Sequence, residues 1–290
     1  PIWIACCKIA NKNRVKDQTT NSCNYRAVIA AVAHRAFEFR RQKYKHLNKH
    51  GYLRMSLYSK FSNYYELIFP FKSQTYSFLS SYLTGDNSRI LDIGCGTGHY
   101  IGRFAEQGHF STGVDIDKSM IEYATNSYPQ AAFLNLDMLN IHSVNESFNL
   151  IYSIGNVVSY LSQNQSLKFL NSVYNALAQG GVWIFQTVNW DNILKNQEYV
   201  FPVIYRQNRD IKFSRRYNKI SEHKINFQTA LEYDNQKVFE DSHTLYPVKE
   251  NDNKIFHRNI GFKFLAHYGD FNRNPYDLKS SLTSIFVYQK

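Results

Sequence analysis

An acidic residue followed by three glycines is the part of this sequence best suited to bind a ligand. Asp92 lies at the carboxyl end of a short apolar run, and Gly94, Gly96 and Gly98 follow at alternate positions. Glycines let the backbone pass close under a ligand, and the free amide N–H groups of such a turn donate to it. A carboxylate here gains from a ligand with a positive amino group, whereas a dinucleotide's pyrophosphate gains nothing from it. The pattern favours a nucleotide-like ligand that carries an amino group.

The apolar spacing around these glycines predicts the elements that position them. A buried strand is expected over residues 89–93 and a helix over 99–107. The next strand is expected over 111–115, which places Asp115 17 residues after the last glycine. An acid at that place can accept hydrogen bonds from two vicinal hydroxyls. Asp117 suits the N-cap of the helix that follows.

The segment Asp92-Ile-Gly94-Cys-Gly96-Thr-Gly98 resembles the first motif of class I S-adenosylmethionine-dependent methyltransferases. Four later segments resemble the family's next elements at the family's spacing: Gly113-Val-Asp115-Ile-Asp117, Leu136-Asp137-Met138, 148–161 and 178–182. The resemblance runs from about Met55 to the C-terminus. It implies an α/β fold with a Rossmann-like, mostly parallel seven-stranded sheet whose last strand is antiparallel. It also implies S-adenosylmethionine as the cofactor.

The resemblance and the ends of the predicted strands together suggest the site residues. We expect the cofactor to contact Asp92, Gly94, Cys95, Gly96, Gly98, Asp115, Ile116, Asp137, Met138, Ser153 and Tyr65. We expect the acceptor to contact Tyr58, Asn156, Tyr160, Asn189 and Trp190. The rings of Tyr58 and Tyr65 lie two helical turns apart, where they either attract a sulfonium cation or form an aromatic core stripe. No side chain stands out as catalytic, and no cluster has metal-ligand spacing.

The net charge of +11 is concentrated in residues 1–54, which hold twelve Lys/Arg and two Asp/Glu and so carry +10. Three of the four cysteines also lie there. One interpretation is a basic arm that binds nucleic acid; the other is a non-native or disordered extension. We expect the methyltransferase domain to occupy 55–290, and we do not expect nucleic acid as a partner. The sequence has no apolar run that could span a membrane, and only Cys95 of the four cysteines lies after residue 54. We therefore expect a cytoplasmic protein.

The spacing of the apolar residues changes in the second half of the chain. A helix over 163–178, closed by Gly180 and Gly181, precedes a fifth strand over 182–188. Residues 197–247 then alternate as strands, which predicts a small antiparallel insert that serves as a substrate lid. Residues 206–224 hold seven Lys/Arg against two acids, which either attract an anionic acceptor or form a solvated strand face. A weak helix over 247–259 and strands over 262–268 and 282–289 complete the prediction.

The function expected is methyl transfer from S-adenosylmethionine to a small-molecule acceptor, at an amine nitrogen rather than a hydroxyl. A neutral amine needs no strong base in the transition state, whereas a hydroxyl usually needs a base or a metal. A nicotinamide-dependent oxidoreductase is one alternative, although His99 stands where its third glycine would be. An RNA or protein methyltransferase that uses the basic arm is another.

Overall fold

The computed structural model of the protein describes residues 61–206 and 210–290. All of them belong to one compact unit, Leu53–Lys290. The expectations for residues 1–54 and for Tyr58 lie outside the described residues. Among the helices that are described, none is both long enough and apolar enough to cross a membrane.

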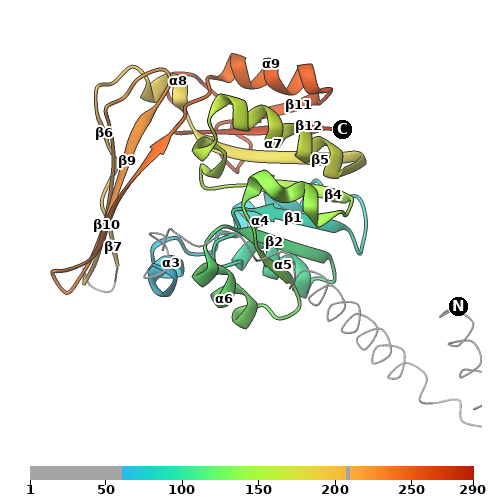
Figure 1. Ribbon diagram of the computed structural model, residues 1–290, viewed down its shortest axis with the longest axis horizontal. Helices are drawn as coiled ribbons and strands as arrows, with labels where there is room; N and C mark the ends of the chain where they lie inside the picture. The colour runs from blue at the N-terminus through green and yellow to red at the C-terminus, as the bar shows by residue number, and fades with distance from the viewer. Residues whose placement is uncertain (1–60, 207–209) are drawn as a thin grey trace, which may run out of the picture. The chain divides into compact units, whose positions relative to one another are not determined.

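A seven-stranded sheet forms the centre of this unit, in the order β11-β12-β5-β4-β1-β2-β3 (Figure 1). Its strands are β1 (Arg89–Ile93), β2 (Phe110–Asp115), β3 (Ala132–Asn135), β4 (Phe148–Ser153), β5 (Leu177–Val188), β11 (Lys263–Tyr268) and β12 (Thr283–Gln289). Neighbouring strands from β3 to β5 are parallel, whereas β12 is antiparallel to both β5 and β11. The predicted α/β fold, mostly parallel with an antiparallel last strand, is confirmed.

Helices cover both faces of this sheet because its central strands are apolar on both sides. The helical segments are α3 (Ser62–Ile68), α4 (Ser73–Ser80), α5 (His99–Glu106), α6 (Lys118–Ser127), η2 (Met138–Val144), η3 (Val157–Tyr160), α7 (Gln163–Ala176), α8 (Trp190–Ile193) and α9 (Glu250–Ile260). Successive residues of a strand point to opposite faces. Ile90 therefore packs with Leu79 of α4 and Ile101 of α5, while its neighbour Leu91 packs with Phe169 of α7.

The junction of α7 and β5 differs from the prediction. The helix ends at Ala176 and the strand begins at Leu177, so the two glycines lie inside β5 instead of closing the helix. Gly180 has a φ of +76°, and its N–H donates to the Lys290 carbonyl (3.2 Å). The pairing of β5 with β4 shifts register between Phe148 and Leu150 of β4. The glycines thus accommodate an irregularity within the strand, a use that a helix-stop pattern does not distinguish.

A second sheet is antiparallel and lies across the end of the first sheet where β5 leads into α8 (Figure 1). Its strands are β6 (Tyr199–Val200), β7 (Ile204–Arg206), β8 (Ile211–Asn218), β9 (Ile225–Tyr233) and β10 (Gln236–Leu245). The path runs β10-β9-β8-β6, with β7 also paired to β8. The turn from β9 to β10 uses Asp234 and Asn235 at φ 50° and 57°, the backbone of a tight hairpin turn. The predicted antiparallel insert is confirmed; its role as a lid stays a prediction.

Candidate active site

The glycine turn after β1 is anchored to the end of β2. The N–H groups of Gly94 and Cys95 both donate to the Val114 carbonyl, at 2.8 and 3.0 Å. Gly94, Gly96 and Gly98 have φ values of +76°, +53° and +80°, which other residues rarely adopt. The turn leads directly into α5, whose first residue is His99. The predicted strand, glycine turn and helix are therefore present, and they form one end of the candidate site.

Asp115 ends β2 beside this turn. Its Oδ2 accepts from the Gly96 N–H (2.9 Å), and its Oδ1 accepts from the Asp117 N–H (2.9 Å). Burial raises the pKa of this carboxyl to about 6, and the backbone donors oppose that rise. A carboxylate offers about four lone-pair positions, so these backbone donors do not use all of its capacity to accept from a ligand. Asp117, as predicted, caps α6 by accepting from the Ser119 and Met120 N–H groups.

Asp92 is 3% exposed, and its Oδ1 has no hydrogen-bond partner among the described residues. It is the direct cross-strand neighbour of Tyr152 on β4. Burial raises the pKa of Asp92 well above its usual range; the Tyr152 phenol lowers it and the charge of Asp115 raises it. Buried carboxylates are normally paired. Asp92 has no cationic partner among the described residues, and its place at the carboxyl end of a central strand is suited to a cationic group of a ligand.

Other polar atoms around the turn are also buried and without a partner among the described residues. They include the Oγ1 of Thr97 and the Nδ1 of His99. The ring of His99 lies among Tyr65, Phe71 and Tyr100. Burial lowers the pKa of His99 to about 4, so the ring is neutral near pH 7. Unsatisfied buried polar atoms are few in native proteins, and their gathering at one turn marks a place for a ligand.

The ring of Tyr65, on α3, lies against the glycine turn. A Cβ on Gly96 would lie 3.5 Å from its Cζ, which is ordinary contact distance. Burial raises the pKa of its phenol, and the charges of Asp115 and Asp92 raise it further. The ring also packs against Phe61 and Phe69. Both interpretations of Tyr65, sulfonium contact and aromatic core, are consistent with this position.

The remaining predicted cofactor residues lie along the same edge of the sheet. Ile116 follows Asp115 and is 67% exposed, so it offers an apolar surface to a ligand ring. Asp137 caps η2 by accepting from the Leu139 N–H (2.9 Å), and Met138 packs against the core. Burial raises the pKa of the Cys95 thiol well above its usual range, so it is no thiolate nucleophile. Cofactor contacts of these residues stay predictions.

Comparison with known proteins identifies the domain built around this turn. Residues 90–181 match the family model described as a methyltransferase domain. A Bacillus subtilis protein named as a methyltransferase, YqeM, is 31% identical over 104 residues, 34% of this chain and 42% of that protein. The chain contains a class I S-adenosylmethionine-dependent methyltransferase domain. It spans less than two thirds of the length of the curated relatives that it matches first.

Solved structures show the same fold over a larger share of the chain. The CcbJ methyltransferase from Streptomyces caelestis superposes with a TM-score of 0.67 at 13% identity, covering 81% of this chain and 98% of that one. An S-adenosylmethionine-bound amino pentose methyltransferase from Micromonospora echinaspora gives 0.59 at 14% identity, covering 83% and 99%. At these identities the likeness concerns the fold alone.

The residues at the turn of this methyltransferase domain fit S-adenosylmethionine, which is the cofactor of the family. The Asp92 carboxyl, whose Oδ1 has no partner among the described residues, suits the amino group of its methionine part. Asp115 has open lone pairs for the ribose hydroxyls. The exposed Ile116 suits the apolar face of the adenine, and Tyr65 stands over the turn. These positions were all predicted from the sequence.

Three predicted site residues, the cofactor residue Ser153 and the acceptor residues Asn189 and Trp190, have polar partners within the structure. Ser153 is buried and its hydroxyl donates to the Ile93 carbonyl (2.7 Å). Asn189 is 1% exposed; its Nδ2 donates to two carbonyls, and its Oδ1 accepts from the Tyr276 hydroxyl. The Nε1 of Trp190 donates to the Ser159 hydroxyl (3.1 Å) inside a core cluster. Asn189 and Trp190 present no free side chain to an acceptor, so the acceptor site we propose omits both.

Asn156 and Tyr160 lie where the loop after β4 meets the second sheet. The Oδ1 of Asn156 accepts from the Ser159 hydroxyl and the Val188 N–H, which fixes its side chain. Its Nδ2 is 3.5 Å from the Tyr217 hydroxyl on β8. The ring of Tyr160 meets the ring of His243 on β10 edge to face, at 5.7 Å between centroids. The structure thus brings both residues to the border between the methyltransferase sheet and the insert.

The sequence analysis missed the side chains of the second sheet that face the methyltransferase domain, which we call the inner face. Phe213 and Leu231 pack there with Phe61 of the domain, and Tyr217 packs with Trp190. Cross-strand register places the remaining members on the same face: Arg215, Phe227, Thr229, Phe239, Asp241 and His243. The alternation of side chains between the two faces of each strand was the sequence signal that could have identified these residues.

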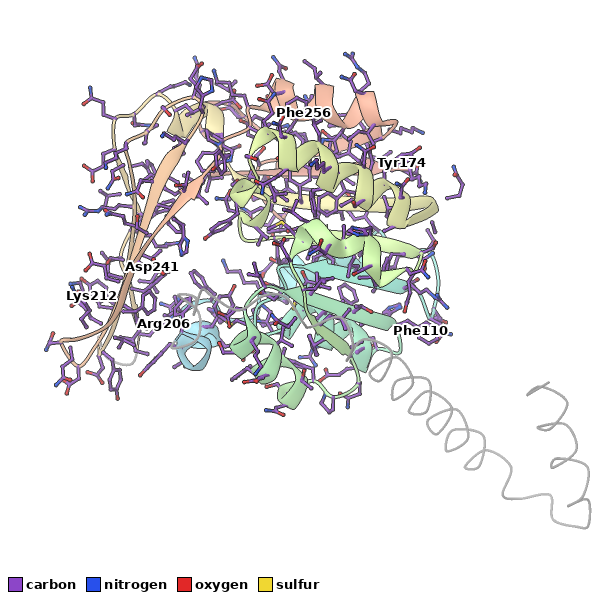
Figure 2. The ribbon with its side chains drawn as sticks, in the orientation of Figure 1. Phe110, Tyr174, Arg206, Lys212, Asp241 and Phe256 are labelled. Carbon is purple, nitrogen blue, oxygen red and sulfur yellow. The ribbon has the colours of Figure 1, made fainter. Side chains whose placement is uncertain are left out.

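Arg215, Thr229 and Asp241 are successive cross-strand neighbours and form a polar row across this apolar face. The Nε of Arg215 and the Oγ1 of Thr229 are buried without a partner among the described residues. The opposite face carries paired groups, such as Lys212 with Glu232 (3.0 Å). Figure 2 labels Lys212 and Asp241 on the two sides of this sheet.

Proposed function

We propose that this protein transfers the methyl group of S-adenosylmethionine to an amine nitrogen of a small-molecule acceptor. The acceptor is held between the glycine turn and the inner face. One observation carries the proposal: among the buried polar atoms that have no partner in the described residues, two groups lie where the cofactor and the acceptor are proposed to bind. One group, around Asp92 and Thr97, lies at the turn, and the other, at Arg215 and Thr229, lies on the inner face. Each group offers unsatisfied polar atoms to a ligand.

The chemistry requires alignment more than acid or base strength. S-adenosylmethionine supplies an activated methyl group on a sulfonium, and the protein must align the nitrogen with it and keep water out. The amine must also arrive without its extra proton. The Nε2 of His243 lies 3.4 Å from Oδ2 of Asp241 on the inner face. Asp241 can hold a cationic amine by a charge-assisted hydrogen bond. A neutral hydroxyl makes no contact of that strength, and this supports an amine over a hydroxyl.

The relatives support a range of acceptors for the family. The amino pentose methyltransferase acts, by its name, on a small amine-bearing molecule. Other matching relatives are a malonyl-[acyl-carrier protein] O-methyltransferase of Buchnera aphidicola and a tRNA methyltransferase of Saccharomyces cerevisiae. We therefore base the proposed class of acceptor on the inner face of this chain, where a compact polar row lies within an apolar surface.

A methyl-transfer screen tests the proposal. The full chain is incubated with S-adenosylmethionine and separate panels of small amines, small alcohols, malonyl-acyl carrier protein and bulk transfer RNA, and S-adenosylhomocysteine is measured. We expect turnover with a small amine and none with the macromolecules. Turnover with transfer RNA or the carrier protein alone would refute the small-molecule assignment. Titration with S-adenosylmethionine and with NAD, followed by calorimetry, separates methyl transfer from hydride transfer.

Asp241→Asn tests the role of the inner face in the same assay. We expect kcat/KM for the amine to fall about tenfold, as for a lost charge-assisted contact, while the affinity for S-adenosylmethionine is unchanged. Glu240→Gln is the matched control, because Glu240 is exposed and paired with Lys237 on the other face. Equal activity of the two variants would remove Asp241 from the acceptor site.

A further inference from the structure

The basic residues of the insert differ in the groups that pair with or hydrogen-bond to their side chains. Arg206 donates to the carbonyls of Leu67 and Ile68 at the end of α3. Lys212 pairs with Glu232, and Arg216 donates to Gln228 and lies 3.9 Å from Glu198. Lys219 and Lys224 are exposed to solvent. Among the described members of this basic set, Arg215 alone is half-buried and has no ion pair, and its Nε is buried without a hydrogen-bond partner.

Aromatic rings surround the Arg215 guanidinium. Its Cζ lies 4.8 Å from the ring centroid of Phe201, 5.7 Å from that of Phe69 and 5.8 Å from that of Phe213. Burial lowers the pKa of this guanidinium, and the phenols of Tyr217 and Tyr199 raise it. No carboxylate of the described residues forms an ion pair with it. A desolvated cation held by ring faces keeps its donors available for an anion.

Arg215 is also connected to the cofactor side of the site. Phe69, which contacts the guanidinium, packs against Tyr65 with 5.3 Å between ring centroids. Tyr65 in turn lies over Gly96 of the turn. Two ring contacts therefore separate the guanidinium from the methyl-donor site.

Thr229 is the second observation that indicates a ligand here. It is the direct cross-strand neighbour of Arg215. Its side chain is 4% exposed, and its hydroxyl has no partner among the described residues. A hydroxyl beside a guanidinium can donate to the same anion that the guanidinium binds. Asp241 continues the row on the next strand, about 10 Å from Arg215 at two strand spacings.

We propose that Arg215 and Thr229 form an anion-binding subsite for the acceptor, which therefore carries a carboxylate or a phosphate group in addition to its amine. The guanidinium fork matches the oxygens of either group. The amine lies toward Asp241, at the other end of the row. The statement that the anion belongs to the methyl acceptor rests on the proposed function. The anion subsite itself can be tested without any methyl transfer.

Binding of simple anions tests the subsite directly. The full chain, saturated with S-adenosylhomocysteine, is titrated by calorimetry with inorganic phosphate and, separately, with succinate. Wild-type protein is expected to bind at least one of them, and Arg215→Gln is expected to weaken that binding about tenfold, the loss of one charge-assisted contact. Arg216→Gln is the matched control, because it removes the same charge from the outer face one residue away. It should bind as the wild type does.

Each outcome decides the proposal. Binding of phosphate alone identifies a phosphorylated acceptor, and binding of succinate alone a carboxylate. If the wild type binds neither anion, or if the Gln variants at 215 and 216 lose binding equally, there is no subsite. Circular dichroism checks the fold; if Arg215→Gln unfolds, Arg215→Lys and Thr229→Val are compared, and undiminished binding in both overturns the proposal.

Turnover then separates this inference from the proposed function. Phosphoethanolamine is compared with ethanolamine, and 4-aminobutyrate with butylamine, in the methyl-transfer assay. We expect the anionic member of a pair to have the lower KM and Arg215→Gln to remove that preference. Anion binding without methylation of any amine would leave the subsite standing and refute the proposed function. Methylation of the neutral amines with a lower KM would refute the subsite and leave the function standing.

Discussion

The ring of Tyr65 lies against Gly96, so that a Cβ on the glycine would be 3.5 Å from the ring's Cζ. The contact joins α3, from the start of the described chain, to the turn that follows β1. The phenol is buried, and the charges of Asp115 and Asp92 act on it. Tyr65 is thus placed where an aromatic ring can face the sulfonium of the methyl donor, although its packing against Phe61 would hold it there in any case.

Tyr65→Leu separates these two explanations. The sulfonium of S-adenosylmethionine carries a positive charge that S-adenosylhomocysteine lacks, and a ring face attracts such a charge by about 1 kcal/mol. We therefore expect the variant to lose about 1 kcal/mol more affinity for S-adenosylmethionine than for S-adenosylhomocysteine, measured by calorimetry. Tyr64→Leu is the control, because Tyr64 packs toward Tyr233. An equal loss for both ligands would show that Tyr65 acts through packing.

Much of the cofactor half of the site could be predicted because its geometry is local. A run such as Arg89–Ile93 followed by glycines specifies a strand and a turn within a few residues. Parallel strands then bring the ends of β1 and β2 together, so that Asp92 and Asp115 meet at one edge. The apolar runs indicated where the strands end, and the resemblance to the methyltransferase family implied that the two strands are neighbours.

The acceptor half could not be predicted because it depends on contacts between distant segments. Asn189 and Trp190 follow β5 at the expected edge, but Tyr276 and Ser159 satisfy their polar atoms. Arg215 was one of seven basic residues in its segment, and the sequence does not show which of them finds a carboxylate. That distinction requires the pairing of β8 with β9, which is set by long-range register.

The carboxyl groups at the turn predict how binding depends on pH. Ribose hydroxyls donate to an ionised carboxylate, and the pKa of Asp115 is raised to about 6 in the ligand-free protein. Binding therefore releases a proton, and affinity for S-adenosylhomocysteine should rise about tenfold from pH 5 to pH 7. Calorimetry in two buffers of different ionisation enthalpy measures the released proton. Asp115→Asn should weaken binding and reduce this pH dependence; a wild-type affinity that is flat over this range would contradict the assignment.

The same carboxyl makes the ligand-free protein less stable as pH rises. Its folded pKa of about 6 lies above the ordinary value of 3.8. The folded state thus binds more protons between these values, so its free energy of unfolding decreases as the pH rises from about 4 to about 6. The decrease is at most about 3 kcal/mol, from the size of the shift. Urea unfolding at several pH values measures it, and Asp115→Asn should remove that part of the decrease.

Gly98→Ala tests whether the turn is fixed by its backbone and its surroundings. Gly98 has a φ of +80°, and an added Cβ would lie 2.6 Å from the ring of Phe133 and 3.0 Å from the Cβ of Ala124. The left-handed backbone and the overpacking together should cost about 2–4 kcal/mol of stability. Affinity for S-adenosylhomocysteine should fall as well, because the turn and the start of α5 must shift to relieve the contact.

Gly85→Ala is the matched control for this substitution. A Cβ there meets no atom within 4 Å, and the backbone is not left-handed. Its effect on the free energy of unfolding should stay within about 0.5 kcal/mol, as for other surface changes. Urea unfolding followed by circular dichroism compares the two variants with the wild type. If both alanines leave stability and ligand affinity unchanged, Phe133 yields freely and the turn is not held by the packing described above.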